Sequence, residues 1–284
     1  KKTSNKKKIN INESLKKYLN KKNYSKEFKE NHIYPMASAI WSTNHKEIGK
    51  MPVQTFINFF NNHGLFKFFN RPTWYTVKGG SKNYVQKILK NTKAKFKRNI
   101  NVIALKKKEG KIEVVTKQER FLFDGVVLAC HADQASKIIK EVDPNVSSIL
   151  RNFKYSKNLA FLHNDKKFMP KNKSIWSSWN YISLNKNNSK KHFFTYWMNK
   201  LQNIKNNNFF LTLNPPFKPN KIYYSTMYEH PIFTKNSMDI PSKLNKVQGR
   251  NGVWYCGSYF YYGFHEDAIK SLINIIKKIE NEFS

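Results

Sequence analysis

The chain has little cysteine, arginine and acidic residue, and it has no long hydrophobic run. Its two cysteines, Cys130 and Cys256, fit no CxxC or cysteine–histidine ligand pattern, so the sequence predicts no metal site. Each ends an apolar run, and we expect two buried, reduced thiols in a cytoplasmic protein. No apolar stretch is long enough for a transmembrane helix, and none follows the basic N-terminus to make a secretory signal.

The charge is strongly one-sided: 52 lysines and arginines stand against 18 acidic residues, a formal net charge of +34 over 284 residues. Such a charge raises the affinity for nucleic acid and for acidic lipid surfaces. Only five of the basic residues are arginine, however, and the lysines are scattered among asparagines. Because nucleic-acid readers favour arginine, the composition favours drift in an AT-rich coding sequence over a specific nucleic-acid function. At most peripheral membrane contact is expected.

The first ninety residues have mainly helical patterns. Residues 12–28 form a lysine-rich amphipathic pattern, and residues 33–41 are apolar and aromatic. Pro52 opens a helix over residues 53–60, which Gly64 ends. A short strand is expected over residues 71–77 before Gly79-Gly80, and Ser81 is a reasonable N-cap for a helix over residues 81–89.

Residues 101–130 follow a strand pattern, with turns at Lys108-Glu109-Gly110 and at Asp124-Gly125. The apolar run over residues 126–130 is typical of a strand buried on both faces, and a helix follows over residues 133–139. Polar loops separate further strands up to residue 233, which predicts a mostly antiparallel sheet. These strands are expected at residues 158–163, 174–181, 192–198, 209–213 and 221–228.

The segment from Gly252 to Ser271 carries the clearest sign of a ligand. A short apolar strand runs into Gly257, a glycine- and aromatic-rich loop follows, and a helix starts near Glu266. A strand, a glycine turn and a helix N-terminus bring backbone N–H groups up to an anionic or electron-rich ligand. Taken alone, the segment is equally a structural strand–turn–helix.

Several motifs combine into a resemblance that covers nearly the whole chain beyond residue 30. They are PMASAIWST from Pro35, FFNNHG from Phe59, RPTWYTVKGGS from Arg71, DGVVLACHADQ from Asp124, LHND from Leu162, SWNY from Ser178, TYWMNKLQ from Thr195, TLNP from Thr212, HP from His230 and the segment from Cys256 to Ser271. With these motifs the chain resembles the FAD-dependent amine oxidase and phytoene desaturase superfamily. Within it, the chain is similar to the bacterial group described as predicted NAD/FAD-binding proteins.

The resemblance implies an α/β (α+β) fold: the C-terminal part of an FAD/NAD(P)-binding Rossmann-like domain with an inserted antiparallel-sheet substrate domain. The expected parts are a helical part of the substrate or cap region at residues 1–90, the FAD-domain β-meander and buried strand at 91–150, the antiparallel-sheet substrate domain at 151–245 and the C-terminal FAD-binding strand and helix at 246–284. The implied cofactor is FAD. The implied FAD contacts are Gly79, Gly80, Ser81, Val102, Ala129, Gly257, Ser258, Tyr259, Gly263, Phe264, His265, Glu266 and Asp267.

Each candidate keeps a structural alternative. Gly79 and Gly80 suit a tight turn as well as a close approach to a flavin, and Glu266 and Asp267 suit the first turn of a helix. His265 is the best-placed candidate acid or base, although a lone histidine is more often structural. Val102 and Ala129 are strand residues first, and His63, His131 and His163 are further acid–base candidates. The aromatics that could line an apolar substrate tunnel, or equally fill a sheet core, are Trp176, Trp179, Tyr181, Tyr196, Trp197, Tyr259, Tyr261 and Tyr262.

The chain departs from the superfamily in one respect. None of its ten glycines forms the GxGxxG turn that lets a backbone approach the FAD pyrophosphate. The chain begins where the middle section of the family would begin. We therefore expect a C-terminal fragment, or a stand-alone half that works with a separate N-terminal half bearing that motif.

The resemblance implies an FAD-dependent oxidoreductase, or its C-terminal part, that abstracts hydride from a C–N or C–C bond. The substrate would be an amine or an apolar, lipid-like molecule, and the net charge favours the second because it repels a polyamine. One alternative is a cofactor-less remnant, or a subunit that needs a separate N-terminal half. A less favoured alternative is a basic nucleic-acid-binding protein, for which the sequence holds no recognition motif.

Overall fold

Three groups of β-strands and the helices around them make up the chain, which the computed structural model describes over residues 13–186 and 189–283. The helices are α1 (Leu15–Lys21), α2 (Lys26–Phe28), α3 (Tyr34–Trp41), α4 (His45–Lys50), α5 (Val53–Asn62), α6 (Lys82–Asn91), α7 (Ala132–Ile138), α8 (Pro144–Arg151), α9 (Met198–Gln202), α10 (Lys235–Met238), α11 (Ile240–Asn245) and α12 (His265–Phe283). The strands are β1 (Val102–Lys108), β2 (Lys111–Thr116), β3 (Arg120–Phe123), β4 (Val126–Leu128), β5 (Lys154–His163), β6 (Trp179–Lys186), β7 (Ser189–Trp197), β8 (Phe210–Leu213), β9 (Ile222–Ile232) and β10 (Val253–Tyr255). The expected mixture of helices and sheets is confirmed.

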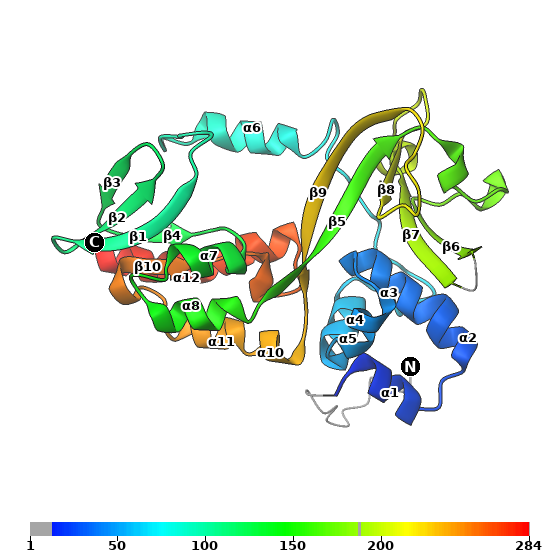
Figure 1. Ribbon diagram of the computed structural model, residues 1–284, viewed down its shortest axis with the longest axis horizontal. Helices are drawn as coiled ribbons and strands as arrows, with labels where there is room; N and C mark the ends of the chain where they lie inside the picture. The colour runs from blue at the N-terminus through cyan, green and yellow to red at the C-terminus, as the bar shows by residue number, and fades with distance from the viewer. Residues whose placement is uncertain (1–12, 187–188, 284) are drawn as a thin grey trace.

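One lobe, on the left of Figure 1, holds two of the strand groups. β1, β2 and β3 form an antiparallel meander, and β4 pairs in parallel with β10. The two parallel strands lie far apart in the sequence, yet Val253 pairs with Val126 and Tyr255 pairs with Leu128. The final strand therefore rejoins the parallel part of the fold, as predicted.

The other lobe, on the right of Figure 1, is built on a five-stranded sheet of order β6-β7-β8-β5-β9. All four pairings in this sheet are antiparallel, which confirms the predicted sheet. β5 and β9 are long strands that run from this lobe back to the first one (Figure 1). Of the helices α1 to α5, which gather below the sheet in this view, α3 contacts β6 and β9, and α1 packs on α4 and α5. A single cluster of buried apolar side chains continues from α1–α5 to β10.

The helix after Pro52 and the hairpin near Gly110 show how local sequence fixes local structure. In α5, Phe56, Phe59 and Phe60 are buried, and the helix ends in a turn where Leu65 N–H donates to the Phe60 carbonyl at 2.8 Å. The turn between β1 and β2 uses positive φ values, +51° at Glu109 and +75° at Gly110. Such a pair of dihedrals matches the twist of a two-residue hairpin, so both predictions are confirmed.

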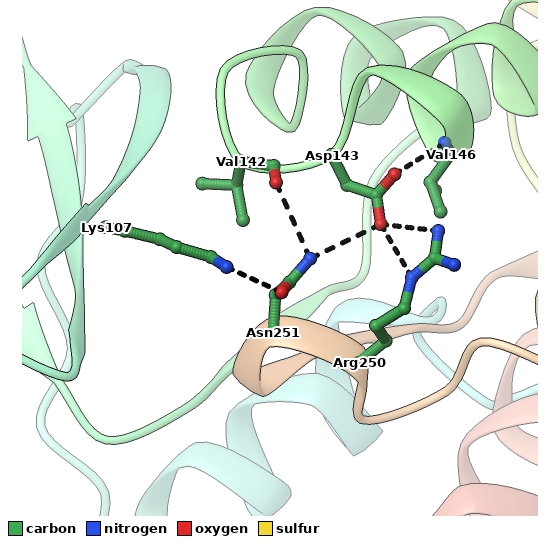
Figure 2. Close-up of polar contacts among 6 residues, drawn as sticks. All are labelled: Lys107, Val142, Asp143, Val146, Arg250 and Asn251. Atoms are coloured by element: carbon green, nitrogen blue, oxygen red, sulfur yellow. Dashed lines mark hydrogen bonds and ion pairs between the residues drawn. The ribbon is translucent and has the colours of Figure 1, made fainter.

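A buried carboxylate ties the turn before β10 to the start of α8 (Figure 2). Arg250 donates to Asp143 Oδ2 through Nε at 2.8 Å and through Nη2 at 2.6 Å, while Val146 N–H donates to Oδ1 at 3.0 Å. Asn251 Nδ2 adds a longer contact to Oδ2 at 3.4 Å, and Lys107 Nζ from β1 donates to Asn251 Oδ1 at 2.7 Å. The network joins three elements at the point where the chain enters β10.

Several predicted elements are wrong in detail. The single N-terminal helix is divided: Asn23 has φ +53°, Ser25 caps α2 through Phe28 N–H, and a π-helical turn follows at residues 29–33. Residue 12 of that prediction lies outside the described residues. Residues 71–77 form no strand, since they pair with no strand of the described chain, and residues 173–175 form a 3₁₀ turn before β6.

The apolar run after Asp124 is shorter and more exposed than predicted. β4 ends at Leu128, Val127 is 38% exposed, and Ala129 is exposed, because β4 has only β10 beside it in the described chain. The predicted burial of both thiols holds for Cys256 and is wrong for Cys130, which is half-buried at this open end. Across residues 13–186 and 189–283, no helix combines the length and the apolar content needed to cross a bilayer.

Candidate functional site

The carboxyl ends of β4 and β10 lie side by side and lead into the glycine loop. Cys256 N–H donates to the Leu128 carbonyl at 3.2 Å, which extends the parallel pairing by one residue. Gly257 N–H then donates to Ser271 Oγ at 2.8 Å, which fixes the turn against α12. A Cβ at position 257 would lie 2.6 Å from Tyr259 Cε1, so the packing of Tyr259 itself requires glycine here.

Asp267 holds the loop over the start of α12. Its Oδ2 accepts the backbone N–H groups of Tyr262 at 3.1 Å and of Phe264 at 3.0 Å. Burial raises the pKa of Asp267, and the two N–H donors oppose that rise by stabilising the carboxylate. Gly263 between them has φ +95°, and a Cβ there would lie 3.0 Å from Pro231 Cγ. The carboxylate is thus a loop anchor.

The helical region supports the loop from the other lobe. Trp41, the last residue of α3, donates from Nε1 to the Tyr262 carbonyl at 3.3 Å. Phe59 of α5 stacks on Phe264 with ring centroids 5.0 Å apart. Residues 257–264 are therefore held by both lobes.

His265 and the double-glycine segment come together through Tyr84. A hydrogen bond of 3.0 Å joins Tyr84 Oη on α6 to His265 Nδ1, and His265 and Glu266 are exposed. Tyr84 follows Ser81 by one turn of chain, so residues 79–81 lie near the start of α12. Gly80 has φ +89°, and a Cβ there would meet nothing within 4 Å. This glycine therefore borders open space.

The remaining predicted contacts lie apart from this centre. Ala129 is exposed one residue beyond β4, beside the carboxyl end of β10. Val102 is half-buried at the start of β1, opposite Thr116, and its described contacts do not join it to the loop. The prediction that Ser81 caps a helix is wrong: it precedes α6, but its side chain makes no cap hydrogen bond, because Ser81 is already in the αR conformation.

Among the buried polar groups at the carboxyl ends of β4 and β10, sequence reasoning named Tyr259 and His131 as candidates but missed Tyr155 and Asp133. Tyr155 Oη accepts Ala132 N–H at 2.9 Å, and its ring stacks on His131 with centroids 4.4 Å apart. In the described chain, Tyr259 Oη and Asp133 Oδ1 are buried without a hydrogen-bond partner. Unpaired buried polar atoms are costly, so this edge suits a polar group of a bound cofactor. A polar residue just after an apolar strand was the available signal.

Two other histidine candidates have structural surroundings. His163 is fully buried in β5, and its Nε2 hydrogen-bonds Thr212 Oγ1 at 2.8 Å. His63 stacks on Phe59 with centroids 3.9 Å apart, and its Nδ1 contacts the Phe59 carbonyl.

The predicted aromatics do not share one tunnel. Trp176 packs edge-on against Trp197 and Phe210 in a small separate core. Tyr259 is buried beside Phe153, whereas Tyr181 lines a cavity of the right-hand lobe.

Fold and site together define a class. Two parallel strands deliver a glycine loop and a helix N-terminus to one edge, and an antiparallel sheet forms a second lobe, as in enzymes that use a dinucleotide cofactor. The model of the family "Flavin containing amine oxidoreductase" matches residues 8–200, more than half of the chain. The chain belongs to this family and is by that membership an FAD-dependent oxidoreductase.

Solved structures show the same fold. A proposed protoporphyrinogen oxidase from Exiguobacterium sp. 255-15 aligns with TM-score 0.65 and 14% identity over 97% of this chain and 69% of its own. A CLA-producing fatty acid isomerase from P. acnes aligns with TM-score 0.57 and 11% identity over 84% of this chain and 60% of its own. Cyclohexylamine oxidase from Brevibacterium oxydans IH-35A aligns with TM-score 0.58 and 10% identity over 95% of this chain and 68% of its own. No curated protein sequence matches.

Proposed function

We propose that this chain supplies the flavin-ring end and the substrate sheet of an FAD-dependent oxidoreductase. The observation that carries the proposal is the Tyr84–His265 hydrogen bond, which brings residues 79–81 to the start of α12. FAD, when bound, supplies a hydride acceptor. We assign the ring contacts to residues 79–81 and 257–267, and the path of the dinucleotide to Val102 and Ala129.

The chain's own groups would orient the ring and balance its charge. The N-terminus of α12 carries a partial positive charge that favours negative charge on a neighbouring ligand. Asp267 fixes the loop by two backbone N–H contacts, so its role is positioning. We assign His265 as the proton carrier, because its imidazole is exposed beside the loop and Tyr84 holds its Nδ1.

For the substrate, the net charge of +34 favours an apolar, lipid-like molecule over an amine. The structural relatives include both kinds, a cyclohexylamine oxidase and a fatty acid isomerase.

A second candidate function is that of a subunit that works with a separate N-terminal half bearing GxGxxG. Within the described residues β10 pairs only with β4, which leaves its other edge for one more strand. One face of α12 packs on Trp254 of β10 through Ile275, while Ile269 and Ile273 on another face are 50% and 59% exposed. An exposed apolar face beside an open strand edge suits a strand–helix partner.

The test is flavin retention. The chain is purified alone, and after co-expression with an N-terminal segment that carries strand, GxGxxG and helix, and its visible flavin absorbance is measured. We expect flavin in the co-expressed complex. Replacing Asp267 by Ala should weaken FAD binding about tenfold by freeing the loop. Glu280→Gln, on the exposed far end of α12, is the matched control and should change nothing.

Absence of flavin from both preparations, even after reconstitution with FAD, would overturn the assignment of the ring site. Flavin in the chain alone would overturn the need for a second half.

A further inference from the structure

A cavity of about 400 Å³ lies in the right-hand lobe, between α3–α4 and the five-stranded sheet. Its walls come from elements that are far apart in sequence: Ser38 and Ser42 from α3 and its end, His45 and Lys46 from α4, and sheet residues that include Tyr181 and Phe194. The volume falls in the range of small-molecule sites.

Two hydroxyls on this wall have no partner. Ser38 Oγ and Thr43 Oγ1 are buried, in residues that are 1% and 9% exposed, and neither makes a hydrogen bond within the described chain. Leaving a buried polar group unpaired costs about 1–3 kcal/mol. Ser42, which lies between them in the sequence, shares a side-chain hydrogen bond with Tyr196. Two orphan hydroxyls on one wall indicate a polar ligand atom that would satisfy them.

The charges of the wall select the sign of that ligand. Lys46 lines the cavity, and the described lining includes no Asp or Glu. Burial and the neighbouring His192 lower the pKa of His45, so its imidazole is neutral at neutral pH. The Glu30 carboxylate lies 3.7 Å from His45 Nδ1, in the adjoining hollow, and Tyr181 Oη hydrogen-bonds the opposite nitrogen Nε2 at 3.0 Å. Hydroxyls can donate or accept hydrogen bonds, so they do not select the charge of the ligand. The positive charge of Lys46 does, and it favours an anion.

Much of the rest of the wall is apolar or already hydrogen-bonded. Phe194, Leu213 and the ring of Tyr181 face the cavity. The amides of Asn158 and Asn214 are paired with each other at 2.8 Å, and Asn214 Oδ1 also accepts Leu159 N–H. The cavity wall therefore combines apolar side chains with two orphan hydroxyls and the exposed Lys46.

Two short chains of contacts connect the cavity to the glycine loop. Ser42 follows Trp41, whose Nε1 donates to the Tyr262 carbonyl. Asn158 contacts His230 Nδ1 at 3.0 Å, and the next residue, Pro231, lies against Gly263. A ligand in the cavity would lie one layer of side chains from the loop.

We propose that this cavity binds an amphipathic monocarboxylate, with the carboxylate at Ser38, Thr43 and Lys46 and the apolar chain along Phe194 and Leu213. The statement that this ligand is the substrate rests on the proposed function. The statement that the cavity binds it does not.

The test titrates octanoate, octylamine and octanol into the flavin-free chain by calorimetry at one ionic strength. Octanoate should bind at a single saturable site at least about tenfold more tightly than octylamine, which corresponds to one favourable charge contact. Lys46→Gln should remove about tenfold of the octanoate affinity and leave octanol unchanged. Lys50→Gln, on the same helix but outside the cavity wall, changes the net charge equally and should have no effect.

Equal losses of octanoate affinity in Lys46→Gln and Lys50→Gln would show that octanoate binds only to the general basic surface. This result would overturn the proposed site. Ser38→Ala and Thr43→Val, checked for folding by thermal melts, should weaken octanoate binding, and unchanged or tighter binding in both would also overturn it. Because the titration needs no flavin, octanoate binding without FAD retention would reject the proposed function alone. FAD retention without octanoate binding would reject this proposal alone.

Discussion

At the residue scale, His163 links the stability of the sheet to pH. Its Nδ1 accepts Asp165 N–H at 3.1 Å, so the proton of the neutral ring is on Nε2, which faces Thr212 Oγ1. Thr212 in turn hydrogen-bonds Thr195 at 2.8 Å. Burial lowers the pKa of His163 from 6.5 to about 4. A second proton would have to sit on Nδ1, against the N–H of Asp165.

The unfolded chain therefore binds a proton at His163 below pH 6.5, while the folded chain stays neutral down to about pH 4. The contribution of His163 to stability should fall as pH drops through this window, by roughly 3 kcal/mol in total, and this contribution should fall no further below it. Urea unfolding at pH 7 and pH 5 measures the change. In His163→Gln, whose amide can still donate to Thr212, the pH dependence should be smaller by about 2 kcal/mol. If the unsubstituted chain and His163→Gln showed the same pH dependence of stability, the dependence would arise from other titrating groups, and the assignment to His163 would be wrong.

Single residues also show what could be predicted from the sequence. Asp267 was expected in the first turn of a helix, and its two backbone contacts follow from local chain geometry. The Tyr84–His265 hydrogen bond joins residues 181 positions apart, so no local pattern signals it. The orphan hydroxyls of Ser38 and Thr43 were equally hidden, because burial and missing partners are properties of the packed structure.

At the element scale, the turn before β10 depends on the Asp143 network. Asp143 is buried, whereas the Arg250 side chain is 45% exposed. Removing Arg250 would leave the buried carboxylate with the Val146 N–H and a long contact to Asn251. An uncompensated buried carboxylate destabilises the folded state, and here it would do so at the turn that leads into β10.

Arg250→Met should therefore destabilise the fold by about 3 kcal/mol, measured as a shift in the urea midpoint. Lys111→Met provides the matched control. It breaks an ion pair of 2.8 Å with Asp124 in which both side chains are exposed, so no measurable change is expected. Equal effects of the two substitutions would show that the Asp143 network contributes no more than a surface pair.

Elements that depend on neighbouring residues in the sequence were predictable, whereas elements that depend on pairing with a distant segment were harder to predict. α5, the β1–β2 turn and α12 follow from Pro52, from Gly110 and from an apolar helical pattern. Residues 71–77 have strand-like composition, but a strand also needs a partner, and none pairs with them in the described chain. The parallel pairing of β4 with β10 brings together segments that the whole antiparallel sheet separates, so it was predicted from the order of the expected elements and from the resemblance, and not from a local pattern.

At the scale of the whole molecule, the net charge is distributed over both lobes. Exposed lysines occur on α1, α6, β1 and α12, which lie on different sides of the fold (Figure 1). A dispersed positive field attracts polyanions, but within the described residues no cluster of arginines is large enough to read bases in a groove. The general charge and a specific nucleic-acid function can therefore be separated by experiment.

We expect the chain to bind duplex DNA and anionic vesicles through this field alone. Affinity for two unrelated DNA sequences should agree within about twofold and fall steeply as salt rises, because binding releases counterions. Vesicles without anionic lipid should not retain the protein, and added salt should release it from anionic ones. Fluorescence anisotropy measures the DNA binding, and vesicle sedimentation measures the lipid binding. A preference of more than about a hundredfold for one DNA sequence would instead require base contacts. In that case the basic surface would have a function of its own, separate from the flavin chemistry of the family.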